Sequence, residues 1–335
     1  MSFDEYMAAC LYDPQHGFYG AGVGVAGRRG DFITSVEVGP LFGAVVAEWL
    51  DAQWDRLGRP SPFVVADVGA GPGTFARSIV AAEPRCEQAV DLVSIELSEQ
   101  ARAAHDPTAG RSLASLDELA FAHVILANEL LDNLPVRILE WREPGWQEIV
   151  VVSAAGVRRE RVRPTADVPA VLRALSTGSA EDAAVERRVR VPASDRAAQW
   201  VLDARTKLDV GGRLLAFDYG ADTVELAARD ATTWLRTFRH HEPGSSPLED
   251  PGMQDITCDV PFDQLPVPID RVRQHEWLRR WGIDRRVEEG RRIWAERAAL
   301  GDLAALRARS RVREAEALLD AEGLGGFWVL EWAPD

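Results

Sequence analysis

The sequence predicts an α/β fold in which a largely parallel sheet carries helices on both faces. Between residues 60 and 141, short apolar runs of strand length alternate with segments of helical pattern, as they do in βαβ units. In addition, 46% of the residues are hydrophobic and 27% are charged, which is typical of a globular protein. A chain of 335 residues is long enough for one such domain with an added subdomain.

Each element follows from its own local pattern. The apolar run FVVADVG is strand-like, and the segment GTFARSIVAAEP after it has helical spacing. The same alternation continues along the chain, and the helical segment before residue 212 is expected to stop at the pair Gly211 and Gly212. The expected elements are strands at 63–69, 91–98, 122–127, 212–220 and 325–332, and helical segments at 73–84, 99–107 and 193–212.

Charge and composition exclude several classes of function. The formal net charge of −15 makes the chain as a whole repel nucleic acid phosphates and anionic membrane surfaces, which favours a cationic partner. No apolar run approaches the length of a membrane span. The acidic start MSFDEYMAAC lacks a secretory leader pattern. The three cysteines are far apart and form no CxxC pair, so they indicate neither a structural zinc site nor a disulfide framework. These observations predict no metal and a cytoplasmic location.

A glycine-rich loop follows the first strand and indicates a nucleoside cofactor. The stretch ADVGAGPGTF places glycines at alternate positions after a buried acid, which lets a backbone approach a ligand closely. The second strand ends at Glu96, whose carboxylate is suited to accept hydrogen bonds from ribose hydroxyls. Since GPGTFA also satisfies G-x-G-x-x-A, an NAD-dependent oxidoreductase remains an alternative. The candidate cofactor residues here are Asp67, Gly69, Ala70, Gly71, Gly73, Glu96 and Leu97.

Polar residues also follow the third strand, where a parallel sheet meets its ligand cleft. The strand AHVILA leads into NELLDNLPV, which contains Asn128, Glu129 and Asp132. Asn128 is a candidate cofactor contact, with a helix N-cap as the structural alternative. Glu129 and Asp132 add negative charge at the position where a substrate would meet the cofactor.

The segment ANELLDNLPVRILEW resembles the ANE(L/F)xDALP segment of the MidA family. The resemblance extends to FDEYMAACLYDPQHGFYG, GRRGDFITSVEVGPLFG, FDYG, LRTFRHH and PLEDPGMQDITCDVPF, and so spans nearly the whole chain. Three positions depart from the family pattern: DVGAGPG stands for ELGPGxG, Val36 for a proline and Asn133 for an alanine. The resemblance implies a Rossmann-like class I methyltransferase sheet and S-adenosyl-L-methionine (SAM) as cofactor. It also implies a protein acceptor with an arginine, such as a respiratory complex subunit.

The N-terminal segment is expected to cover the cofactor, as class I methyltransferases commonly place a flap there. It is Gly-rich and polar, and burying the sulfonium beneath it would exclude water. Tyr12 and Ser35 belong to this flap. Its candidate cofactor contacts are Tyr19, Gly30, Asp31 and Thr34.

The resemblance suggests a division of the chain. Residues 1–59 form the cofactor-covering segment, and residues 60–239 form the SAM-binding core with a polar excursion at about 153–192. Residues 240–324 form an irregular and helical subdomain, and residues 325–335 add the final core strand.

Methyl transfer needs alignment of the reactants rather than a metal or a covalent intermediate. Because a guanidinium has a pKa above about 12 and is a poor nucleophile, carboxylates are expected to localise its charge on one nitrogen. Glu129 is the first candidate for this catalytic role by position, and Asp132 and Glu37 are the next. A non-catalytic SAM-binding assembly factor and a small-molecule methyltransferase remain open alternatives. The oligomeric state is not predicted.

Overall fold

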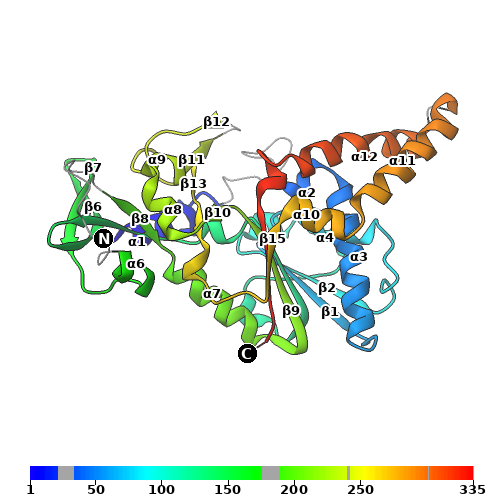
Figure 1. Cartoon of the computed structure of the whole chain (residues 1–335), viewed down its shortest axis with the longest axis horizontal. Coiled ribbons are helices and arrows are strands. Elements are labelled where there is room, and N and C mark those ends of the chain that lie inside the picture. Colours follow the sequence, from blue (N-terminus) through cyan, green and yellow to red (C-terminus); the bar gives the residue numbers. More distant parts are fainter. Residues whose placement is uncertain (22–33, 176–188, 240–241, 301, 335) are drawn as a thin grey trace.

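The computed structural model of the chain describes residues 1–21, 34–175, 189–239, 242–300 and 302–334. A seven-stranded sheet lies at its centre, with helices on both faces (Figure 1). The five neighbouring strands from β9 to β3 are parallel, and β16 is inserted antiparallel between β9 and β15. This architecture confirms the predicted fold class. In spatial order the strands are β15 (Asp270–Arg273), β16 (Trp328–Trp332), β9 (Leu208–Asp218), β4 (Ala122–Asn128), β1 (Phe63–Val68), β2 (Val90–Ile95) and β3 (Arg111–Leu113).

The central strands are apolar on both faces because both faces are covered. In β1, Phe63 and Val65 pack on one side, and Val64 and Ala66 pack on the other. The first face is covered by five helices and the second by α7 (Asp195–Thr206). The five helices are α3 (Pro40–Arg56), α4 (Thr74–Val80), α10 (Gln274–Arg280), α11 (Ile283–Arg297) and α12 (Leu303–Leu319).

Smaller sheets lie beside the central one, over the carboxyl ends of its strands and next to the N-terminal helix. Their apolar core includes Phe3, Met7, Ile138 and Trp234. The strands are β5 (Arg137–Arg142), β6 (Gly145–Ala154), β7 (Val157–Pro164), β8 (Arg190–Ala193), β10 (Gly220–Ala221), β11 (Leu235–Arg239), β12 (Glu242–Pro243), β13 (Asp255–Cys258) and β14 (Val260–Pro261). The remaining α-helices are α1 (Phe3–Tyr12), α2 (Ser35–Val38), α5 (Glu99–Arg102), α6 (Ala170–Leu175), α8 (Thr223–Ala228) and α9 (Ala231–Trp234).

The subdomain predicted to be irregular and helical contains a hairpin of two helices near the C-terminus. α11 and α12 run side by side and extend away from the sheet (Figure 1). Only their inner ends join the core, through Ile283, Val287, Ala315 and Leu318. Among the described residues, no helix combines the length and apolarity needed to span a membrane.

One predicted boundary is wrong. α7 ends at Thr206, and the glycine pair expected to stop it lies inside β9. There Gly211 takes the left-handed φ of 76°, close to a register shift between β9 and β4. A glycine pair in a strand can mark such an irregularity, so local pattern alone did not distinguish it from a helix stop.

Candidate active site

The order of the strands places the site at the carboxyl ends of β1 and its neighbours. β1 lies between β2 and β4, so the chain crosses in opposite directions on either side of it. A crevice forms at such a switch point, outside the carboxyl ends of the strands. The predicted cofactor loop follows β1, and the predicted acidic segment follows β4.

The glycine loop has the backbone that its sequence suggested. Gly69, Gly71 and Gly73 have left-handed φ values of 73°, 50° and 75°, which favour glycine. The amides of Gly69 and Ala70 donate to the carbonyl of Ile95 at 2.9 and 3.1 Å, which ties the loop to the end of β2. A Cβ added at Gly71 would have no atom within 4 Å, so this glycine faces open space.

Glu96 holds the glycine loop from the side of β2. Its Oε2 accepts from the amide of Gly71 at 2.9 Å, and its Oε1 accepts from the amide of Ser98 at 2.8 Å. Each carboxylate oxygen has a second lone pair, so these bonds leave capacity for ribose hydroxyls. The side chain of Leu97 is 54% exposed at the end of the same strand.

Asp67, the buried acid at the end of β1, faces the same region. Burial raises its pKa to about 7, and the charge of Glu96 adds to the increase. Its Oδ2 has no hydrogen-bond partner among the described residues. The proton that this carboxyl group retains near neutral pH would let it donate to a ligand.

Glu129 is held in a strained conformation after β4. Its φ of 49° is in the left-handed region, which is uncommon for a residue with a side chain. Its amide donates to the carbonyl of Phe217 at 2.8 Å, and its Oε1 accepts from the amide of Ser35 at 3.0 Å and from Nδ2 of Asn128 at 3.2 Å. The N-terminal segment, β4 and β9 therefore meet at this residue. Burial raises its pKa to about 8.

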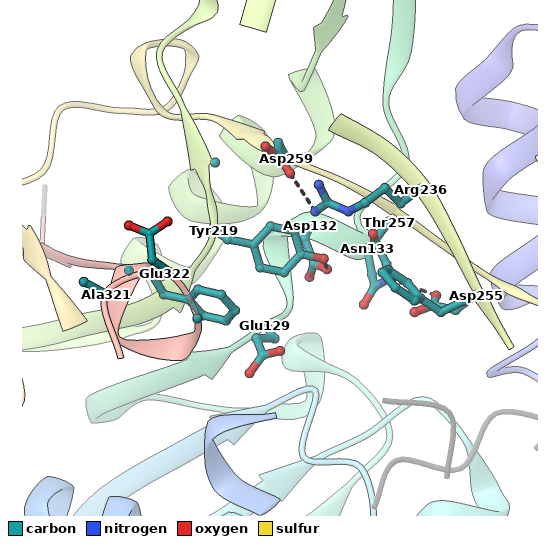
Figure 2. Close-up of a pocket in the computed structure, with 15 residues that line it drawn as sticks. Glu129, Asp132, Asn133, Tyr219, Arg236, Asp255, Thr257, Asp259, Ala321 and Glu322 are labelled. Carbon is teal, nitrogen blue, oxygen red and sulfur yellow. Dashed lines mark hydrogen bonds and ion pairs between the residues drawn. The ribbon is translucent and has the colours of Figure 1, made fainter. Parts of the chain in front are cut away.

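A cavity of about 500 Å³ opens next to Glu129, between the central sheet and β11 and β13 (Figure 2). Five carboxylates contribute to its lining, and Arg236 is the only basic residue among the described ones that line it. The aromatic rings of Tyr219, Phe238 and Phe327 form part of the wall. The five acids are Glu129, Asp132, Asp255, Asp259 and Glu322. The cavity is therefore acidic and aromatic, which suits a planar cation.

Asp132 lies in this cavity with one oxygen bound. Its Oδ2 accepts from the hydroxyl of Tyr219, whereas its buried Oδ1 has no hydrogen-bond partner among the described residues. Burial raises its pKa to about 6, against the opposing effects of the Tyr219 hydrogen bond and of Arg236. Asp132 thus has one buried carboxylate oxygen without a hydrogen-bond partner among the described residues, next to the cavity.

The other predicted residues lie in different parts of the site. Glu37 is buried in α2 and close enough to raise the pKa of Glu129, but it is not among the described lining residues of the cavity. The hydroxyls of Tyr12 and Tyr19 donate to the backbone oxygen and Oδ1 of Asn133, at 3.1 and 3.4 Å, on the cavity side of the site.

Two predicted contacts in the N-terminal segment cannot be placed. Gly30 and Asp31 lie outside the described residues. Thr34 is buried directly before α2, at its N-cap position.

Sequence reasoning missed several cavity residues, namely Tyr219, Arg236, Asp255, Thr257 and Asp259. They lie in FDYG, LRTFRHH and DITCDVPF, which were matched to the family without a role for any side chain. The feature that could have identified them is the concentration of acidic residues in strand segments that are otherwise apolar. Their proximity to Asp132, more than 85 residues earlier for Tyr219, arises only on folding.

Comparison with known proteins gives a matching family and several similar proteins. A sequence model of the family described as "Putative S-adenosyl-L-methionine-dependent methyltransferase" matches residues 45–277. A crystal structure of a Burkholderia thailandensis protein bound to S-adenosyl-homocysteine superimposes with a TM-score of 0.81 at 25% identity, over 100% of this chain and 88% of that one.

Curated relatives carry a more specific name. The Drosophila melanogaster "Protein arginine methyltransferase NDUFAF7 homolog, mitochondrial" is 30% identical over 296 residues, which are 77% of this chain and 64% of that protein. The chain thus spans slightly less than two thirds of that relative. The human "Protein arginine methyltransferase NDUFAF7, mitochondrial" is 26% identical over 331 residues, 85% of this chain and 70% of that protein.

These names contradict one prediction. The cytoplasmic location inferred from the first residues and the cysteines is wrong, since the curated relatives are named mitochondrial. The absence of a secretory leader pattern distinguishes secretion from other fates and carries no information on which internal compartment a protein occupies.

Proposed function

Since the chain belongs to this family of S-adenosyl-L-methionine-dependent methyltransferases, we propose that it transfers the methyl group to an arginine guanidinium of a protein. The observation that carries this proposal is the acidic, aromatic cavity beside Glu129. The names of the curated relatives support the same acceptor chemistry. A subunit of a respiratory complex is the first acceptor to examine, as the family resemblance implies.

The residues after β1, β2 and β4 fit the cofactor. Gly71 faces open space that a Cβ would enter, and Oδ1 of Asn128 is buried with no hydrogen-bond partner among the described residues. We assign Asp67, Glu96 and Asn128 as the polar contacts of the adenosyl group. The bound cofactor supplies an electrophilic methyl group on a sulfonium. The chain must position the acceptor nitrogen against it and exclude water.

In this proposal, Glu129 and Asp132 act on the acceptor. An ionised Glu129 accepts N–H bonds from the guanidinium and localises its positive charge away from the attacking nitrogen. The guanidinium nitrogen forms the new bond to carbon as the carbon–sulfur bond breaks, and one N–H proton must leave afterwards. Oδ1 of Asp132, which has no other described partner, can accept that proton.

Replacing Glu96 by alanine should weaken SAM binding by roughly 1.5–3 kcal/mol, the range for hydrogen bonds to a charged group. This corresponds to a loss of affinity of about tenfold to over a hundredfold. Calorimetry with S-adenosylhomocysteine would measure it, with Glu99→Ala as control because Glu99 is exposed three residues further on. An unchanged affinity in a folded Glu96→Ala variant would restrict Glu96 to a structural role.

The pH dependence of transfer should report the protonation of Glu129. Because its pKa is raised to about 8, most of this carboxyl group is protonated at neutral pH in the free enzyme. If the ionised form is required, kcat/KM should increase with pH and level off above about 8. The residual kcat/KM of Glu129→Gln should no longer increase with pH in this range. A profile that is flat between pH 6 and 9 would contradict the assignment.

The acceptor chemistry can be tested directly. We would incubate the protein with SAM labelled in the methyl group and a lysate of its source organism, then hydrolyse the labelled proteins to amino acids. Labelled methylarginine is the expected product. Label in another amino acid or in a small molecule would overturn the arginine proposal, and SAM binding without any transfer would indicate a non-catalytic assembly factor.

A further inference from the structure

Arg236 is the cation of the cavity, and it is held in place from two sides. On β11, its Nη2 donates to Oδ1 of Asp259 at 2.7 Å, and its Nη1 donates to the backbone oxygen of Thr233 at 2.5 Å. Its guanidinium lies over the ring of Tyr219, 5.1 Å from the ring centroid (Figure 2). The position of this charge is therefore determined by the protein, before any acceptor arrives.

Tyr219 connects this cation to Asp132. Its hydroxyl donates to Oδ2 of Asp132, and its ring also contacts Phe327, with the centroids 5.1 Å apart. Its amide donates to Oδ1 of Asp218 at 2.9 Å. The ring is thus fixed at its backbone, against Phe327 and against the guanidinium of Arg236, so that its hydroxyl points at a single carboxylate oxygen.

The surroundings of Asp132 are otherwise unfavourable to its negative charge. Glu129, Asp218 and Asp259 bring further carboxyl groups from the ends of β4, β9 and β13. The thiol of Cys258 and the phenols of Tyr12, Tyr19 and Tyr219 also face it, and none of them carries positive charge. Among these described neighbours, Arg236 is the one positive charge, and it lowers the pKa of Asp132 together with the hydrogen bond from Tyr219.

We propose that Arg236 is a positioning residue of the acceptor site: it keeps the Tyr219 hydroxyl on Oδ2 of Asp132 and keeps Asp132 anionic, which leaves Oδ1 available to the acceptor. Arg236 itself is engaged by Asp259 and Thr233 and does not need to touch the acceptor. The inference rests on the proposed function only in naming the acceptor a guanidinium. The coupling of Arg236 to Asp132 through Tyr219 stands on the contacts alone.

The experiment compares Arg236→Gln with Arg229→Gln. Arg229 is a matched control because it contacts the same Asp259, at 3.3 Å from Oδ2, from a partly exposed position outside the cavity lining. Carboxyl carbon NMR of protein labelled at aspartate would follow Asp132, whose resonance is identified by its loss in Asp132→Asn. We expect the pKa of Asp132 to increase by about one unit or more in Arg236→Gln, as for loss of a nearby opposite charge, and to stay unchanged in Arg229→Gln.

The rate of methyl transfer provides the second readout. The acceptor is the lysate protein that the labelling experiment identifies. In Arg236→Gln, kcat at neutral pH should fall about twofold if the pKa of Asp132 increases by one unit from about 6, and about tenfold if it increases by two units. It should recover largely at high pH, because Asp132 then ionises without the cation. Arg236→Lys, which keeps the charge, should retain most of the wild-type pH profile. A purely structural role would lower activity equally at every pH.

Two outcomes would overturn the proposal: an unchanged Asp132 pKa in folded Arg236→Gln, or a loss of activity that does not depend on pH. If Arg236→Gln does not fold, Tyr219→Phe replaces it, since loss of the hydroxyl should also raise the pKa of Asp132. The NMR result does not depend on methyl transfer. If the wild type makes no methylarginine and the pKa of Asp132 still increases in Arg236→Gln, the proposed function is rejected and the positioning role is kept.

Discussion

Replacing Gly71 by valine is expected to abolish binding of SAM and S-adenosylhomocysteine. The position has a left-handed φ of 50°, which a β-branched residue adopts only with strain. A side chain there would also enter the open space beside the loop, and the loop amide that donates to Glu96 would be displaced. Calorimetry on the folded variant measures the effect.

Gly156→Val is the matched control for this variant. Gly156 has a left-handed φ of 79°, and a Cβ there would likewise meet no atom within 4 Å, but it lies in the turn between β6 and β7. It therefore tests the cost of backbone strain without touching the cofactor loop. Equal loss of SAM binding in the two variants would attribute the effect to stability, and normal binding in Gly71→Val would place the cofactor elsewhere.

Glu129→Gln is expected to reduce methyl transfer by at least about tenfold, which needs only 1.4 kcal/mol of lost transition-state stabilisation. Glutamine keeps the size of the side chain and can still accept from the amide of Ser35. It removes the charge that localises the guanidinium. Single-turnover transfer and SAM affinity, measured on the same preparation, separate the two steps.

SAM affinity should change much less than transfer in this variant, because Glu129 lies on the cavity side of the site. Glu118→Gln, which removes an exposed carboxylate outside the described cavity lining, controls for the change in net charge. Equal losses in transfer and SAM affinity would move Glu129 into the cofactor site. Full activity would shift the role to Asp132, whose Oδ1 has no hydrogen-bond partner among the described residues, or to Glu37.

The proposed cofactor half of the site could be recognised in the sequence because its determinants are local. The determinants lie in one short segment: a buried strand, a turn with three glycines and an acid after the next strand. Each of these local patterns usually corresponds to one structure. The positive φ values of Gly69, Gly71 and Gly73 explain why glycine occupies these positions. The sheet follows from the same patterns, since strands buried on both faces show continuous apolar runs.

The acceptor half could not be predicted in the same way. Its residues come from the ends of β4, β9, β11 and β13 and from the turn before β16, which are distant in sequence. No local pattern predicts that Tyr219 donates a hydrogen bond to Asp132 or that Arg236 lies over the ring of Tyr219. These contacts depend on how the smaller sheets pack over the central one.

The sequence by itself determined the fold class, the cofactor loop and the acidic character of the segment after β4, because propensity and spacing specify elements one at a time. The tertiary structure alone decided which acids share a cavity and in which protonation state. Burial raises the pKa of Glu129 to about 8 and that of Asp132 to about 6, and Arg236 is the only positive charge among the described lining residues. Desolvation and charge proximity are properties of the packed chain, so no reading of isolated motifs could supply them.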